Sequence, residues 1–231
     1  MCHALPVSPA ELAAEAAAAV SAGASDIHVH PKDAAGRDTL EADTVAAVLE
    51  AIRATVPAHV QIGVTTGAWV ERDPRRCAAL VRAWTTLPDH ASVNWHEDGA
   101  EHVAQALLVR GVGIEAGIYS GTDAARRFRA SAWPARVVRV LAEVTDSEPD
   151  TAIGTAAALL DELEPLGQTR ILLHGEDGGA WPVLGYAARL GLDSRIGMED
   201  VLTMPDGTPA TGNAELVTAA RSIIRECSAQ R

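Results

Sequence analysis

His28 and His30 lie one residue apart, at the end of an apolar run that begins at Ile27. Side chains alternate between the two faces of a β-strand, so residues i and i+2 point to the same side. Two imidazoles on one side of a strand end can hold one metal ion through their ring nitrogens. The alternative is that one histidine is hydrogen-bonded in the core while the other faces solvent, because a bare His-x-His pair is a weak motif.

Polar side chains also follow the other predicted strands. Four of the eight histidines stand at such strand ends, and three of the ends carry an adjacent Glu-Asp pair. In (β/α)8 barrels the active site lies at the carboxyl ends of the strands, so this distribution favours an enzyme. Helix N-caps account for Asp98 and Asp177 without any chemistry, whereas they account less well for the histidines. Besides the His28-Val29-His30 strand, the ends read Thr65-Thr66-Gly67, Asn94-Trp95-His96-Glu97-Asp98, Tyr119-Ser120, His174-Gly175-Glu176-Asp177 and Met198-Glu199-Asp200.

Two histidines and one carboxylate make a three-ligand set with open positions, which is typical of catalytic zinc. Glu199 is the best carboxylate for this set, because its predicted strand is the last one. Closure of a barrel would bring that strand near the one that carries His28 and His30. His96 and His174 compete as ligands; the alternative for each is to bind substrate or to orient a neighbouring side chain.

Arg195 precedes the Glu199-Asp200 pair by four residues. In an extended strand Arg195 and Glu199 would face the same side, which would place a guanidinium in the mouth of the barrel. The alternative is that Arg195 forms an ion pair at the surface.

Strands and helices are predicted to alternate along almost the whole chain. Apolar strands joined through helices by short connections predict a parallel sheet with helices outside it. The pattern corresponds to the α/β class and to a (β/α)8 TIM-type barrel, one domain over 1–231, that lacks its first strand. The segment Met1–Val7 is too short to supply that strand convincingly. A doubly wound sheet is the alternative, but no Gly-x-Gly-x-x-Gly motif follows the first predicted strand. The seven predicted strands cover about 26–30, 60–65, 91–96, 113–119, 136–143, 170–174 and 194–198.

The composition indicates which partners and which cellular compartment to expect. A formal net charge of −12 argues against nucleic acid or an anionic membrane as a partner. No apolar run is long enough to cross a bilayer and no signal peptide is visible, so we expect a cytoplasmic protein. The three cysteines, Cys2, Cys77 and Cys227, are scattered and form no Cys-x-x-Cys pattern, which fits a reducing compartment.

Two groups of motifs resemble those of the β-keto acid cleavage enzyme family. One group combines a strand that ends in His-x-His with a following Gly-Arg-x-Thr-Leu segment, and the other combines Arg-x-Gly-x-Glu-Asp with later turn and helix motifs. The first group reads Ala22-Gly23-Ala24, His28-Val29-His30-Pro31-Lys32-Asp33 and Gly36-Arg37-Asp38-Thr39-Leu40. The second reads Arg195-Ile196-Gly197-Met198-Glu199-Asp200, Pro205-Asp206-Gly207 and Asn213-Ala214-Glu215-Leu216-Val217.

The resemblance implies a zinc-dependent (β/α)8 enzyme that condenses a β-keto acid with acetyl-CoA to give acetoacetate and an acyl-CoA. It further implies that His28, His30 and Glu199 hold Zn²⁺, and that Arg195 and Asp200 form the catalytic polar pair. Zinc would polarise the keto acid as a Lewis acid, and a carboxylate near Arg195 could act as the base. The expected partners are therefore small molecules, a β-keto acid and acetyl-CoA. The residues assigned to substrate binding are Thr65, Thr66, His96 and Glu115.

The chain departs from the family pattern at three places. The first strand is missing, Lys32 stands where arginine is commoner, and Glu115 is one glutamate where relatives often have two. A sheet that lacks a strand exposes an edge, so we expect a homo-oligomer that covers it. Two other interpretations stay open: a metal-dependent amidohydrolase, which would also use His96, His174 and Asp200, and a catalytically inactive barrel remnant.

Overall fold

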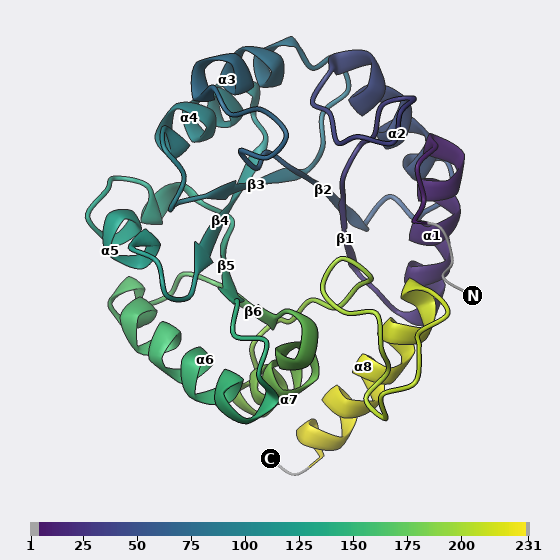
Figure 1. Cartoon of the computed structure of the whole chain (residues 1–231). Helices are drawn as coiled ribbons and strands as arrows, with labels where there is room; N and C mark the ends of the chain where they lie inside the picture. The colour runs from purple at the N-terminus through teal and green to yellow at the C-terminus, as the bar shows by residue number, and fades with distance from the viewer. Residues whose placement is uncertain (1–4, 230–231) are drawn as a thin grey trace. The chain divides into compact units, whose positions relative to one another are not determined.

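The computed structural model describes residues 5–229, in which strands and helices alternate (Figure 1). The described strands follow the order β1-β2-β3-β4-β5-β6, so each strand in the sequence neighbours the next one in the sheet. The pairs β1–β2, β2–β3 and β5–β6 are parallel, as predicted for an α/β chain. The six strands are β1 (Asp26–Val29), β2 (Gln61–Thr65), β3 (His90–Asn94), β4 (Gly113–Tyr119), β5 (Arg139–Val144) and β6 (Ile171–Gly175).

Capping residues in the sequence mark the ends of several helices. Ser8 caps the first helix through a capping box with Glu11, and Gly23 ends it with φ 112° in the left-handed region that favours glycine. The helices are α1 (Pro9–Ala22), α2 (Ala42–Arg53), α3 (Pro74–Ala83), α4 (Ala100–Arg110), α5 (Ala124–Arg129), α6 (Pro149–Leu163), α7 (Ala180–Leu190) and α8 (Asn213–Ser228). Short 3₁₀ segments occur at Pro134–Arg136, Glu164–Leu166 and Asp177–Gly179.

The chain forms two compact units, residues 1–115 and 116–231, and their boundary falls inside β4. In the first unit β1 and β2 pair in register from Asp26 opposite Gln61, and β2 pairs with β3. Helix α1 packs against α2, and α3 packs against α4. The prediction of a single barrel domain over 1–231 stays a prediction.

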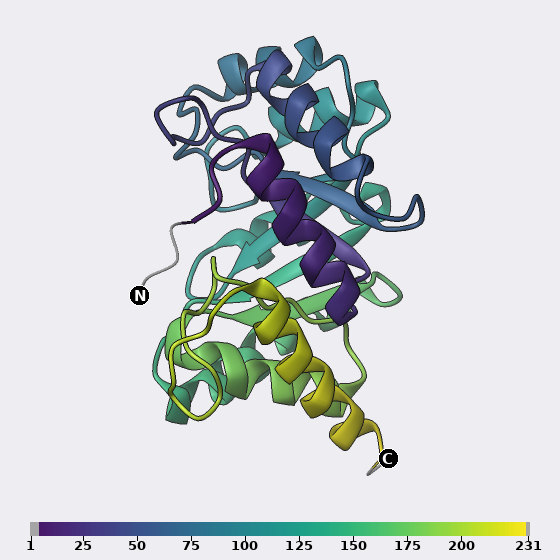
Figure 2. The ribbon, with the colours of Figure 1, turned by 90° about the vertical axis from the view of Figure 1, so that its right-hand side faces the viewer.

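The second unit is built around the β5–β6 pair, in register from Val140 opposite Ile171. Helix α7 packs on β6, and α8 lies against α7 (Figure 2). Residues Val140 to Val144 of β5 and Leu172 to Gly175 of β6 are buried without alternation, which is typical of a parallel strand covered on both faces. Polar side chains within these two strands are therefore held away from water.

The predicted strand over 194–198 is wrong. Asp193, just before this segment, makes one isolated parallel bridge with Leu172, and residues 194–198 form no strand. The backbone of this segment is satisfied by other partners, because Asp200 N–H donates to the Gly197 carbonyl and Met198 N–H donates to the Asn213 side chain. Turn and side-chain hydrogen bonds therefore replace the strand pairing that the apolar pattern suggested.

Three further predictions concern the N-terminal segment, the cysteines and membrane-spanning helices. In the segment 1–7, which was predicted to be too short for a first strand, residues 5–7 form no strand and residues 1–4 lie outside the described residues. Cys77 and Cys227 carry free thiols, and Cys2 also lies outside the described residues. Within residues 5–229, none of the helices has the length and apolar character needed to cross a bilayer.

Candidate active-site clusters

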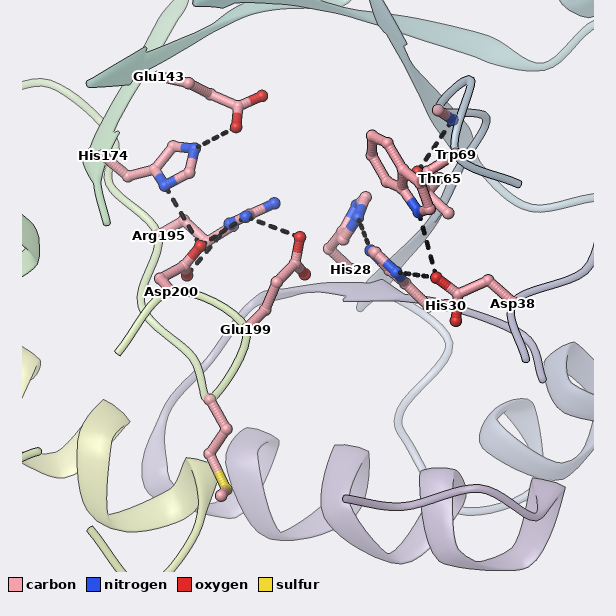
Figure 3. Close-up of polar contacts among 12 residues, drawn as sticks. His28, His30, Asp38, Thr65, Trp69, Glu143, His174, Arg195, Glu199 and Asp200 are labelled. Atoms are coloured by element: carbon pink, nitrogen blue, oxygen red, sulfur yellow. Dashed lines mark hydrogen bonds and ion pairs between the residues drawn. The ribbon is translucent and has the colours of Figure 1, made fainter. Parts of the chain in front are cut away.

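In the first unit, His28 near the end of β1 and His30 just after it project to the same side, as their spacing predicts. Their Nε2 atoms lie 3.2 Å apart, and the two rings meet edge to face with centroids 5.2 Å apart (Figure 3). Both side chains are partly buried. The end of β1 thus brings the Nε2 atoms of His28 and His30 close together.

Asp38 fixes the tautomer of His30. Its Oδ2 lies 3.0 Å from His30 Nδ1, and Lys32 Nζ contacts the other carboxylate oxygen. The hydrogen bond from His30 and then that from Lys32 outweigh burial and lower the pKa of the Asp38 carboxyl, so it is an ionised acceptor at neutral pH. His30 must then donate from Nδ1, and a neutral imidazole in that tautomer presents the Nε2 lone pair towards His28.

Trp69 completes this cluster, and the sequence reasoning missed it. Its ring stacks on His30 with centroids 5.9 Å apart and an interplanar angle of 25°, and its Nε1 donates to Asp38 Oδ2 at 3.2 Å. Gly67 makes room for the indole, since a Cβ on residue 67 would overlap the Trp69 ring. The sequence feature that could have indicated this role is a glycine in the turn after a strand, followed two residues later by a tryptophan.

The His28–His30 pair fits a zinc ion. Zinc binds histidine nitrogen at about 2.0–2.1 Å in tetrahedral geometry, which puts two nitrogen ligands about 3.3 Å apart. The observed separation of 3.2 Å between the Nε2 atoms is a hydrogen-bond distance and is also compatible with this bite. A ligand histidine also donates its second ring N–H to a carboxylate in most metal sites, and Asp38 accepts that bond from His30.

The predicted substrate-binding residues of this unit are mostly buried. The Thr65 hydroxyl accepts a hydrogen bond from Gly67 N–H at 3.2 Å, and the Thr66 hydroxyl donates to the Ser92 carbonyl at 2.6 Å. Glu115 is buried within β4, at 2 % exposure. His96 is partly buried and follows β3. The threonine hydroxyls therefore hold the turn after β2 in place.

In the second unit, Arg195 joins the two acids that the sequence paired with it. Its Nη2 lies 2.6 Å from Asp200 Oδ1 and 3.2 Å from Glu199 Oε1, and its Nε lies 3.3 Å from Asp200 Oδ2. The turn at Gly197 brings residue 200 back beside residue 195. Asp200 is buried whereas Glu199 is exposed. Although burial raises it, the pKa of Asp200 is lowered by Arg195 and by His174.

His174 in β6 lies between two carboxylates of the same unit (Figure 3). Its Nε2 is 3.6 Å from Glu143 Oε2 and its Nδ1 is 3.5 Å from Asp200 Oδ1, and the His174 side chain is 0 % exposed. Burial and Arg195 lower its pKa, but the contacts with Asp200 and Glu143 dominate and raise the pKa to about 9.

Glu143 is a second member that the sequence reasoning missed. It is 4 % exposed in the middle of the apolar strand β5, and a lone glutamate in such a run was the available signal. Glu143 also affects two groups at the ends of neighbouring strands. Burial and then the charge of Glu143 raise the pKa of the Tyr119 hydroxyl, and the same two causes raise the pKa of the Glu176 carboxyl. The second unit thus holds a chain of alternating charges, Arg195, Asp200, His174 and Glu143.

The comparison with known proteins agrees with these motifs. No curated protein matches the chain. The family model of the β-keto acid cleavage enzymes matches residues 1–230, which is nearly the full sequence. The chain therefore belongs to the β-keto acid cleavage enzyme family.

Proposed function

We propose that the protein is a zinc-dependent enzyme that condenses a β-keto acid with acetyl-CoA and releases acetoacetate and an acyl-CoA. The observation that carries the zinc requirement is the convergence of two Nε2 atoms at 3.2 Å, with Asp38 behind His30. His28, His30 and Glu199 are the proposed ligands. When bound, zinc would supply a Lewis acid that polarises the keto group of the substrate.

Arg195 and Asp200 are the proposed catalytic pair. Arg195 keeps the Asp200 carboxyl ionised, so that it accepts a proton from the substrate. A lowered pKa makes a weaker base, and Asp200 would gain basicity when the guanidinium of Arg195 turns towards the carboxylate of an incoming keto acid. Thr65, Thr66, His96 and Glu115 are the proposed substrate contacts.

Family membership favours this function over an amidohydrolase and over an inactive remnant. An amidohydrolase site would require His174 among the metal ligands. His174 is instead enclosed by two carboxylates, one at each ring nitrogen. We further propose that the six strands belong to a barrel of the (β/α)8 class in one functional domain, and that the enzyme acts as a homo-oligomer.

Metal analysis of purified protein tests the proposal. Wild type should carry one zinc per chain, and His30→Ala should carry severalfold less because it removes one ligand and the link to Asp38. His102→Ala, which changes an exposed histidine of α4, is the matched control and should keep its zinc. Equal zinc in His30→Ala and wild type would overturn the ligand assignment. Acetoacetate release, measured over keto acids of different charge and length, tests the reaction.

A further inference from the structure

We propose that His174 is a positioning residue, a buried imidazolium that holds the Asp200 carboxylate in place while Glu143 keeps it charged. This inference rests on the proposed function, in which Asp200 moves a proton. It concerns residues of the second unit alone.

The geometry favours the charged form of the ring. Both ring nitrogens of His174 face carboxylate oxygens, Glu143 at 3.6 Å and Asp200 at 3.5 Å. Ionised carboxylates only accept hydrogen bonds, and a neutral imidazole has a single N–H. A neutral His174 would therefore set a lone pair against one carboxylate, whereas the imidazolium offers an N–H to each. At these separations the contacts are ion pairs, because N–H···O hydrogen bonds are about 2.7–3.2 Å long.

The charges around His174 come from several elements. Glu143 faces it from β5 and Asp200 from the turn after residue 197, with Arg195 on the far side of Asp200. Glu176 follows β6, and Tyr119 at the end of β4 lies beside Glu143. Asp200 pairs with Arg195 as well as with His174, whereas Glu143 forms its ion pair with His174, is hydrogen-bonded to Tyr119 and interacts electrostatically with Arg195. Removing the charge on His174 would leave Glu143 buried beside a neutral ring, which is costly.

Both the side chain and the backbone of Asp200 are fixed by neighbouring groups. Arg195 binds both of its carboxylate oxygens, and His174 contacts Oδ1. The Asp200 carbonyl accepts the N–H of Asp177 at 2.7 Å, and its own N–H donates to Gly197. His174 is fully buried and contacts Asp200, so its proposed effect on the reaction passes through Asp200. Orientation of this kind matters because a misplacement of about 1 Å in a catalytic group can cost about 10²-fold in rate.

The first experiment measures the protonation of His174 directly. Nitrogen NMR of ¹⁵N-histidine-labelled wild type, with His174→Gln to assign the signal, should show both ring nitrogens protonated at pH 7.5. The titration should have its midpoint near the pKa of about 9. Glu143→Gln should move that midpoint down towards the ordinary histidine value of about 6.5. A neutral His174 at pH 7.5 in wild type would overturn the proposal, whether or not the protein proves to be active.

The second experiment uses turnover. His174→Gln should lower kcat about 10²-fold with KM and zinc content nearly unchanged, and should remove the alkaline limb of the kcat profile near pH 9. His90→Gln is the control, since it breaks the contact of buried His90 with partly buried Asp26 in the first unit and should lower stability without changing the pH profile. Active wild type together with an unchanged His174→Gln would refute the positioning role. Inactive wild type would refute the proposed function and leave the NMR result to decide the charge of His174.

Discussion

The two histidine clusters differ in how many ring nitrogens face a carboxylate. His30 has Asp38 at Nδ1 and the ring of His28 at Nε2, and its side chain is 17 % exposed. His174 has a carboxylate at each nitrogen and is 0 % exposed. The same residue type, at strand ends in both units, therefore sits in two opposite electrostatic settings.

This difference separates a ligand from a cation. One carboxylate fixes one N–H and leaves the other nitrogen as a lone-pair donor, which is what a metal requires. Two ionised carboxylates favour a ring with two N–H groups, and an imidazolium has no lone pair to offer a metal. His174, which competed with Glu199 as a ligand in the sequence interpretation, is therefore disfavoured in that role. The partners of a histidine, rather than its place at a strand end, decide its chemistry.

The largest expected effect comes from the neighbouring acids Glu199 and Asp200. Asp200→Asn keeps the shape but removes the proposed base, so kcat should fall about 10³-fold while zinc stays bound. Glu199→Gln should lose zinc and activity together, because its proposed role is ligation. Metal content and acetoacetate release of both variants provide the measurement, with thermal unfolding as the control for folding. Two variants that differ in stability alone would contradict the assignment.

Stability against pH should reveal the buried imidazolium. The pKa of His174 is raised to about 9, so its contribution to folding is fully present below the ordinary value of about 6.5 and is lost as the pH rises through 9. The loss is on the order of 3 kcal/mol, since each pKa unit corresponds to about 1.4 kcal/mol. Urea unfolding at pH 6 and pH 10 measures it. In His174→Gln this part of the decline should disappear, and a decline equal to that of wild type would count against the imidazolium.

The contact between Asp38 and His30 should tune the metal site without belonging to it. Asp38→Asn removes the charged acceptor of the His30 Nδ1–H, and zinc affinity should fall about 10- to 100-fold. Competition with a chromophoric chelator measures the affinity. Asp33→Asn changes a nearby acid that pairs with Arg37, and should leave the affinity unchanged. An equal loss in both variants would point to a general effect of loop charge.

The sequence predicted the parts of the molecule that depend on local pattern. The alternation of apolar strands with helices predicted the α/β class, and the i, i+2 rule placed His28 and His30 on one side. The prediction of a strand at 194–198 failed. The apolar pattern suits a strand, but the backbone groups of this segment form turn and side-chain hydrogen bonds instead.

Glu143 and Trp69 were missed for a different reason. Their roles depend on contacts with residues distant in the chain, His174 for one and Asp38 for the other. Periodicity and local motifs carry no information about such partners. A polar residue inside an apolar strand, such as Glu143, is the sequence feature that comes nearest to revealing them.

The smallest effect should come from Trp69. Trp69→Phe keeps an aromatic ring over His30 but removes the Nε1–H that donates to Asp38 at 3.2 Å. A single hydrogen bond contributes about 1 kcal/mol at most sites, and Trp69 is 53 % exposed, so zinc affinity should fall only a few-fold. Gly67→Ala should do more, because the added methyl would displace the whole ring and remove both the stacking and the hydrogen bond. Chelator competition on the two variants ranks these contributions. If Trp69→Phe weakened zinc binding as much as Asp38→Asn, the indole rather than the carboxylate would be orienting His30.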